Sequence, residues 1–182
     1  MEQVSNNIKI AIKCDLSKKS GLGHFKRMYG LSLELEKYNF KTYFIFFKNQ
    51  KKIIKSLLNA SRFIFLKNSL KKQDNKIIKY LKNNYFKMLI IDSYENTENF
   101  SKLIKQNSEI KIIKISDQVK NDSADLIITN HENDNIKENN FVLSGFKYAL
   151  SNSTQKRNFK KKLINKKKLN VLIHGGGTDQ YI

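Results

Sequence analysis

Residues 15–27 combine an acidic residue, a glycine-rich turn and a histidine directly after an apolar run. His24 comes straight after the turn Gly21-Leu22-Gly23, and Asp15 opens the same loop. A neutral imidazole in a ligand crevice can act as a general base, and the start of a helix favours the neutral form because it disfavours added positive charge. Asp15 could orient or polarise that ring. The alternative is that Asp15 caps the loop and His24 simply packs.

The spacing of Gly21 and Gly23 also fits a turn that lets the backbone approach a ligand closely. Because a helical pattern follows, the N–H groups of its first turn would face an anion, typically a diphosphate. The pattern differs from the dinucleotide-binding fingerprint, since a third glycine at the required spacing is missing and no acidic residue closes the second strand. The stretch alone leaves both a helix-capping turn and a phosphate-binding loop open.

Neither a metal site nor a cofactor is expected. His24, His131 and His174 are far apart in the sequence and none forms a spaced pair of ligands. Cys14 would pair with His24 as a nucleophile only if its thiol were reactive, and its place at the end of an apolar strand favours packing as a small hydrophobe. A second glycine run at 175–179 resembles another phosphate loop, although a bare glycine run is a weak signal.

The elements that must position these residues alternate between short apolar runs and helical spacing. Apolar or aromatic runs predict strands, and apolar residues three and four apart predict helices. The predicted strands are 8–14, 40–47, 62–66, 86–92, 110–116 and 124–129, and 140–150 is predicted to be a last strand that runs into a turn. The predicted helices are 24–38, 50–60, 69–85 and 97–107. This alternation indicates an α/β fold with a doubly wound, mostly parallel Rossmann-like sheet.

Ligands of such sheets bind beyond the carboxyl ends of the strands. The polar segments found there are Asp15–His24, Asp92–Tyr94, Ser116–Asp117, Thr129–Asn130 and Gly145–Tyr148.

The chain divides into three parts. Residues 1–150 form the predicted Rossmann-like domain, and 151–168 are a polar, basic linker. Residues 169–182 start again with an apolar strand and a glycine loop, which indicates the first strand and loop of a truncated second α/β domain.

The composition indicates a globular cytoplasmic protein. Of its 182 residues, 40% are hydrophobic and 11% aromatic, no apolar run is long enough for a membrane span, and the single cysteine fits a reducing compartment. The net charge of +19 comes from lysines scattered along the whole chain, whereas arginine occurs only at positions 27, 62 and 157. Since arginine is the usual residue for bidentate phosphate and base contacts, we expect a solvated basic surface and neither a nucleic-acid nor a membrane partner.

Four motifs in order resemble one family. They are Asp15-x-Ser17-x-x-x-Gly21-x-Gly23-His24-x-x-Arg27, then Ile91-Asp92-Ser93-Tyr94, then Gly145-x-x-Tyr148-Ala149-Leu150, then Gly176-Gly177-Thr178-Asp179. Together they resemble the PseG family of pseudaminic acid biosynthesis, a pathway linked to flagellin glycosylation. Those enzymes hydrolyse UDP-2,4-diacetamido-2,4,6-trideoxy-β-L-altropyranose and have the two-domain GT-B architecture.

The resemblance implies a nucleotide-sugar hydrolase that releases UDP without a metal or other cofactor. His24 would activate the attacking water, and Tyr94 would position sugar or water in the same pocket. Gly21 and Gly23 would let the loop approach the diphosphate, and Asp15 and Ser17 would shape the sugar pocket. The remaining substrate-binding positions that the resemblance implies are Arg27, Asp92, Tyr148, Gly176, Gly177 and Thr178.

Two rival functions remain open. In a GT-B glycosyltransferase, His24 would act on an acceptor hydroxyl in place of water. In a non-catalytic binding or partner domain, the fold would be kept and the site would be inert. Because the uridine site of the GT-B architecture lies in the second domain, a separate C-terminal uridine-binding polypeptide is an expected partner.

Overall fold

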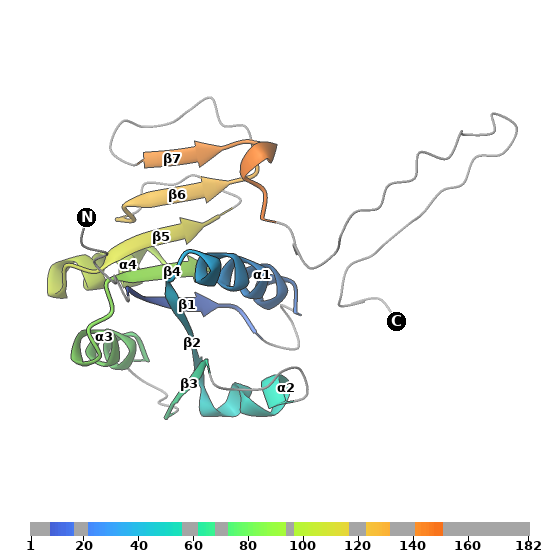
Figure 1. Ribbon diagram of the computed structural model, residues 1–182. Helices are drawn as coiled ribbons and strands as arrows, with labels where there is room; N and C mark the ends of the chain where they lie inside the picture. Colours follow the sequence, from blue (N-terminus) through green and yellow to red (C-terminus); the bar gives the residue numbers. More distant parts are fainter. Residues whose placement is uncertain are drawn as a thin grey trace, which may run out of the picture.

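The computed structural model describes residues 8–16, 22–55, 62–67, 73–93, 97–116, 123–131 and 141–150 (Figure 1). The predicted linker at 151–168 and the predicted start of a second domain at 169–182 lie outside these residues. Nothing in the structure therefore tests that division of the chain.

Strands and helices alternate along the described part of the chain. The strands are β1 (Lys9–Cys14), β2 (Lys41–Phe47), β3 (Phe63–Leu66), β4 (Met88–Asp92), β5 (Lys111–Ile115), β6 (Leu126–Thr129) and β7 (Phe141–Ser144). The α-helices are α1 (Gly23–Lys37), α2 (Lys51–Lys55), α3 (Gln73–Asn83) and α4 (Glu98–Asn107), and two 3-10 turns are η1 (Lys48–Gln50) and η2 (Phe146–Tyr148).

All seven strands form one parallel sheet in the order β3-β2-β1-β4-β5-β6-β7. The chain winds outward from β1 to β3 in one direction and from β4 to β7 in the other (Figure 1). The winding direction reverses between β1 and β4, and such a switch point is where sheets of this class bind ligands. The predicted doubly wound α/β fold is confirmed.

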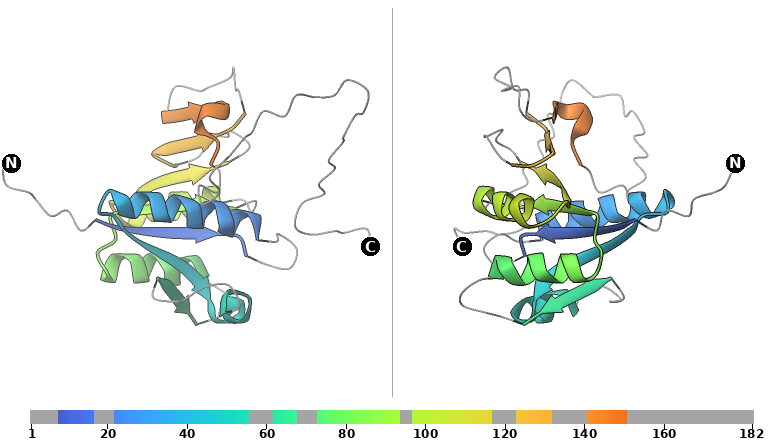
Figure 2. Two further views of the ribbon diagram at one scale, coloured as in Figure 1. Left: turned by 45° about the vertical axis from the view of Figure 1, so that its right-hand side comes forward. Right: turned by 90° about the vertical axis from the view of Figure 1, so that its left-hand side faces the viewer.

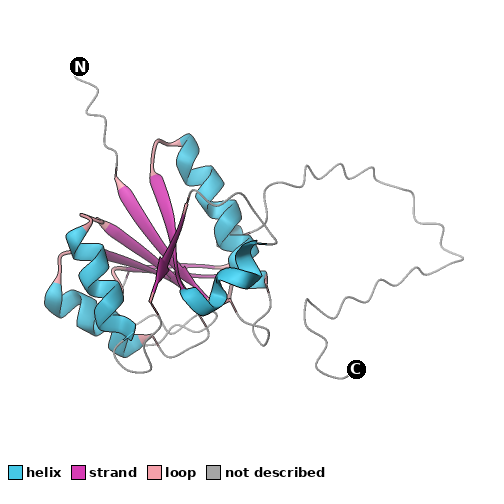
Figure 3. Ribbon diagram, turned by 90° about the horizontal axis from the view of Figure 1, so that it is seen from below, coloured by secondary structure: helices cyan, strands magenta, loops and turns pink. Residues whose placement is uncertain are grey.

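Helices cover both faces of the sheet, as the views in Figures 2 and 3 show. One face packs against α3 and α4, and its core includes Ala11, Leu89, Ile91 and Ile112. The other packs against α1 and α2, and its core includes Ile10, Ile12, Phe44, Phe46 and Ile90. Neighbouring residues of a strand point to opposite faces, so a strand covered on both sides must be apolar throughout.

The last strand is shorter than the apolar run 140–150. β7 ends at Ser144 because Gly145 adopts a φ of 101°, a left-handed conformation that turns the chain into η2. None of the helices in the described part of the chain combines the length and apolarity that a bilayer crossing requires.

Candidate active site

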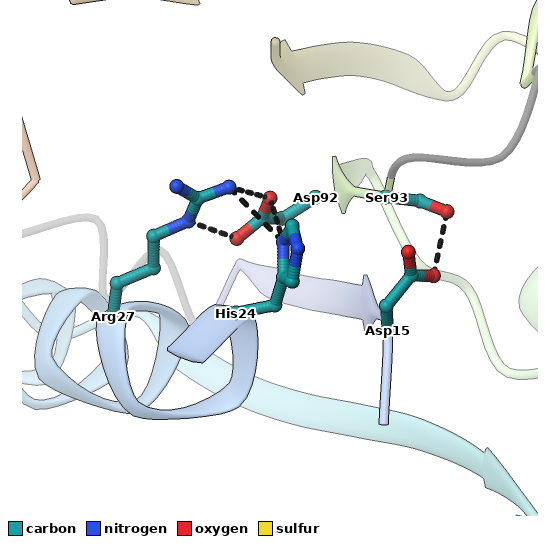
Figure 4. A network of polar contacts seen from close by, with 5 residues as sticks. All are labelled: Asp15, His24, Arg27, Asp92 and Ser93. Carbon is teal, nitrogen blue, oxygen red and sulfur yellow. Dashed lines mark hydrogen bonds and ion pairs between the residues drawn. The ribbon is translucent and has the colours of Figure 1, made fainter. Parts of the chain in front are cut away.

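Five polar side chains from three elements meet at the carboxyl edge of the sheet (Figure 4). Asp15 follows β1, Asp92 ends β4 and Ser93 follows it, while His24 and Arg27 lie in the first two turns of α1. The site lies where β1 and β4 are neighbours, at the switch point of the sheet.

The register of β1 and β4 brings the two aspartates to the same level. Cys14 is the register partner of Asp92, and the Asp15 amide donates to the Asp92 carbonyl at 3.1 Å. The chain then returns into α1, which packs through Phe25 and Met28 on the β1–β4 sheet face. That packing fixes where the first turn of α1 begins, and so where His24 and Arg27 point.

The carboxylate next to His24 belongs to Asp92. Nδ1 of His24 lies 2.7 Å from Oδ1 of Asp92, and both side chains are buried, with His24 4% exposed and Asp92 0%. A carboxylate oxygen can only accept, and two lone pairs at this distance would repel, so Nδ1 carries a proton and donates it. In the neutral ring this leaves the lone pair on Nε2, the tautomer required of a general base.

Arg27 also holds the Asp92 carboxylate. Its Nε donates to Asp92 Oδ2 at 2.5 Å, and its Nη2 forms an ion pair with Asp92 Oδ1. Nη2 also lies 3.0 Å from Nδ1 of His24. Since a guanidinium nitrogen can only donate, that contact is not a hydrogen bond while Nδ1 carries its proton. This two-pronged contact between a guanidinium and a carboxylate is directional, and it fixes the orientation of Asp92.

A second polar pair lies beside the first. Ser93 donates from Oγ to Oδ1 of Asp15 at 2.6 Å, which joins the ends of β1 and β4 (Figure 4). To orient His24 is one of the two roles considered for Asp15, and the carboxylate at hydrogen-bond distance from Nδ1 is that of Asp92. Sequence reasoning assigned Asp92 to the substrate pocket and gave Ser93 no role, although both belong to the quoted motif at the end of β4.

The charge of Asp92 suits its place beside α1. No acidic residue lies in the first turn of this helix, and its N-cap residue, Leu22, makes no side-chain capping bond. The N-terminus of a helix carries partial positive charge, so a carboxylate is stabilised there and a guanidinium such as that of Arg27 is not. Asp92 compensates both the helix end and Arg27.

Gly23 begins α1 and leaves open space beside the site. Among the described residues, a Cβ built on Gly23 would have no atom within 4 Å beyond those of its chain neighbours and of the helix backbone. Packing within the described part of the chain therefore does not require glycine at this position.

Cys14 is not a nucleophile. Burial raises the pKa of its thiol well above the usual value, and the negative charges of Asp92 and Asp15 raise it further. The thiol therefore stays protonated, as its predicted packing role requires.

The other predicted positions are placed only in part. Tyr148 lies in η2, where the Lys147 ammonium sits 4.8 Å from its ring centroid. Ser17, Gly21, Tyr94, Gly176, Gly177 and Thr178 lie outside the described residues. Within the part of the chain that is described, no three His, Cys, Asp or Glu side chains come close enough together to hold a metal ion.

Comparisons with known proteins place the fold. No protein-family model matches the chain. It is 30% identical over 186 aligned positions to the uncharacterized protein MJ1062 of Methanocaldococcus jannaschii, with 94% of this chain and 37% of that protein covered. The chain thus spans little more than a third of this relative's length.

Among solved structures, the chain is similar to MurG of Acinetobacter baumannii. The TM-score is 0.54, and the match covers 74% of this chain and 44% of MurG at 8% identity. The fold is that of a GT-B N-terminal domain. At this level of identity the similarity concerns the fold alone, and the chemistry must be argued from the site.

Proposed function

We propose that this chain carries the catalytic half of a nucleotide-sugar hydrolase, with His24 as the general base. The observation that carries the proposal is the hydrogen bond from His24 to Asp92 at the switch point of a GT-B-type sheet. The resemblance of the four motifs to the PseG family is the reason for proposing the specific substrate, UDP-2,4-diacetamido-2,4,6-trideoxy-β-L-altropyranose.

In the proposed reaction a water oxygen attacks the anomeric carbon of the sugar. The new C–O bond forms as the bond from that carbon to the UDP diphosphate breaks, and UDP leaves as an anion. The proton of the water passes to Nε2 of His24, because Nδ1 already donates to Asp92. The His24 ring is thereby held in place before substrate arrives.

The free space beside Gly23 supports a role in substrate approach. Since a Cβ would meet nothing there, we expect Gly23→Ala to fold with unchanged or slightly higher stability. If the diphosphate lies against the start of α1, the added methyl group raises KM for the nucleotide sugar. Unchanged KM and kcat in Gly23→Ala would show that the diphosphate does not lie against this residue.

A glycosyltransferase is the second candidate, and the fold that the chain shares with MurG is compatible with it. The same base would then take its proton from an acceptor hydroxyl, and the sugar would be transferred to that oxygen. The two candidates differ in one observable, which is whether UDP release requires an added acceptor.

The test is UDP release by the complete natural polypeptide that carries this sequence, with the altrose-type UDP-sugar as substrate. We expect release without an acceptor, and we expect His24→Ala to lower kcat by about 10²–10⁴-fold, the usual contribution of a general base. His131→Ala is the matched control, since His131 is exposed and follows β6.

Two results would contradict the proposal. Turnover of His24→Ala within a few fold of the parent would remove His24 as the base. UDP release that appears only when an acceptor sugar is added would replace the hydrolase with the transferase.

A further inference from the structure

Two side chains, those of His24 and Arg27, share the buried carboxylate of Asp92, and the three residues differ in exposure. The side chains of Asp92 and His24 are 1% and 4% exposed, whereas that of Arg27 is 29% exposed. The guanidinium thus lies between solvent and a buried imidazole–carboxylate pair.

We infer that Arg27 is a positioning residue that acts on His24 through Asp92. Its charge balances the buried carboxylate, so that the imidazole remains neutral with its proton on Nδ1. The assignment of the tautomer does not depend on the substrate. Its catalytic consequence, an unprotonated Nε2, rests on the function proposed above.

The buried carboxylate of Asp92 needs a compensating cation, because a buried charge is costly unless it is paired. Among the described residues, the groups in contact with Asp92 that can compensate it are the guanidinium of Arg27 and an imidazolium of His24. The neighbouring carboxylate of Asp15 accepts a hydrogen bond from Ser93. With Arg27 paired to Asp92, one cation already balances that carboxylate, and His24 need not take a second proton.

Removal of the guanidinium charge changes that count. Asp92 would then have His24 as its remaining partner at these contacts, and the pair would be balanced only if both ring nitrogens carried protons. An imidazolium has no lone pair on Nε2 and cannot accept a proton. The charge of Arg27 therefore decides whether His24 is able to act as a base.

The geometry of the contact between Arg27 and Asp92 helps to position His24, separately from the charge of Arg27. Nε binds Oδ2 and Nη2 binds Oδ1, which holds the carboxylate plane and keeps Oδ1 directed at Nδ1 of His24. A lysine at this position supplies the charge but not the two-pronged contact, whereas a glutamine supplies a hydrogen-bond donor without the charge. Arg27→Lys and Arg27→Gln therefore separate the two contributions.

The experiment is ¹⁵N nuclear magnetic resonance of the 182-residue chain labelled at histidine, at a pH of about 7.5, above the usual histidine range. His24→Gln assigns the His24 signals. We expect the parent chain to show a protonated Nδ1 and an unprotonated Nε2. In Arg27→Gln the Nε2 signal is expected to move to the protonated position in most molecules, and in Arg27→Lys to stay unprotonated.

Arg62→Gln is the matched control, because Arg62 forms an ion pair with Glu36 at the amino end of the sheet. It should leave the His24 signals unchanged. A neutral ring in Arg27→Gln that matches the parent would overturn the inference. A protonated Nε2 in the parent chain would overturn it as well, and that readout does not depend on whether the variant folds.

The outcomes separate this inference from the proposed function. If the parent spectrum is as expected but the protein releases no UDP, the hydrolase proposal is refuted and the role of Arg27 stands. UDP release that survives in Arg27→Gln with a neutral ring would refute the role of Arg27 and leave the hydrolase intact.

Discussion

Asp125 joins three elements of the fold, and its replacement gives a quantitative test of the structure. The residue lies just before β6, and one of its carboxylate oxygens, Oδ2, accepts the backbone N–H of Ile112 at 2.7 Å. The same oxygen pairs with Lys105 of α4, and Oδ1 lies 3.2 Å from Nζ of Lys111. The carboxylate thus extends the pairing of β5 beyond the first register pair of β5 and β6, Ile113 with Leu126.

The magnitude follows from these contacts. In Asp125→Ala the N–H of Ile112, a residue with 0% exposure, loses its acceptor, which costs about 1–3 kcal/mol. The half-exposed contacts with lysine add about 0–1 kcal/mol. We therefore expect a loss of about 1–4 kcal/mol in the free energy of unfolding. Asp125→Asn keeps an oxygen for the Ile112 N–H and should lose about 1 kcal/mol or less.

The pH dependence provides a second measurement. Burial tends to raise the pKa of Asp125, but hydrogen bonds from Lys105, the Ile112 amide and Lys111 outweigh it and hold that pKa below its ordinary value. A lowered pKa stabilises the folded state fully above the unfolded-state pKa, which is about 3.9. That stabilisation is lost as the pH falls from there through the folded-state pKa. The advantage of the parent over Asp125→Asn should shrink over this acidic range.

The assay is urea unfolding followed by far-ultraviolet circular dichroism, with Glu109→Ala as the control. Glu109 is an exposed acidic residue just before β5, and its replacement should change stability by less than about 0.5 kcal/mol. A loss in Asp125→Ala no larger than that of Glu109→Ala would refute the bridging role of Asp125.

Two further predictions test the backbone and the site. Tyr85 has a φ of 58° and an 80% exposed side chain, so Tyr85→Gly should raise the free energy of unfolding by about 1 kcal/mol, because glycine relieves the left-handed strain. Tyr38→Gly is the control in the same urea assay, because Tyr38 is similarly exposed but has a φ of −99°. This replacement should not raise the free energy of unfolding, and equal effects of the two replacements would contradict the reasoning. Burial raises the pKa of the Cys14 thiol, and the negative charges of Asp92 and Asp15 raise it further. The native thiol should therefore react with a disulfide reagent far more slowly than the thiol of the urea-unfolded chain. Equal rates would contradict the burial of Cys14.

The sequence by itself determined the fold class and the edge of the sheet at which the site lies. Continuous apolar runs such as that of β4 can be satisfied only by burial on both faces, and residues such as Phe25 and Met28 repeat at the spacing of a helix. These are local patterns, and the alternation that they predict leads to a parallel sheet with its polar residues at the strand ends. The position of His24 at the start of a helix was predictable for the same reason.

Only the tertiary structure decided which carboxylate His24 contacts. Asp15 is nearer to His24 in sequence, but Asp92 supplies the hydrogen bond because β1 and β4 are neighbours in the sheet and Cys14 and Asp92 are in register. Strand order depends on how whole strands and helices pack against one another, and it places residues distant in sequence side by side. The same packing brings Arg27 into contact with Asp92. The sequence alone indicated a glycine loop followed by a histidine, whereas the structure shows a buried carboxylate held by an imidazole and a guanidinium.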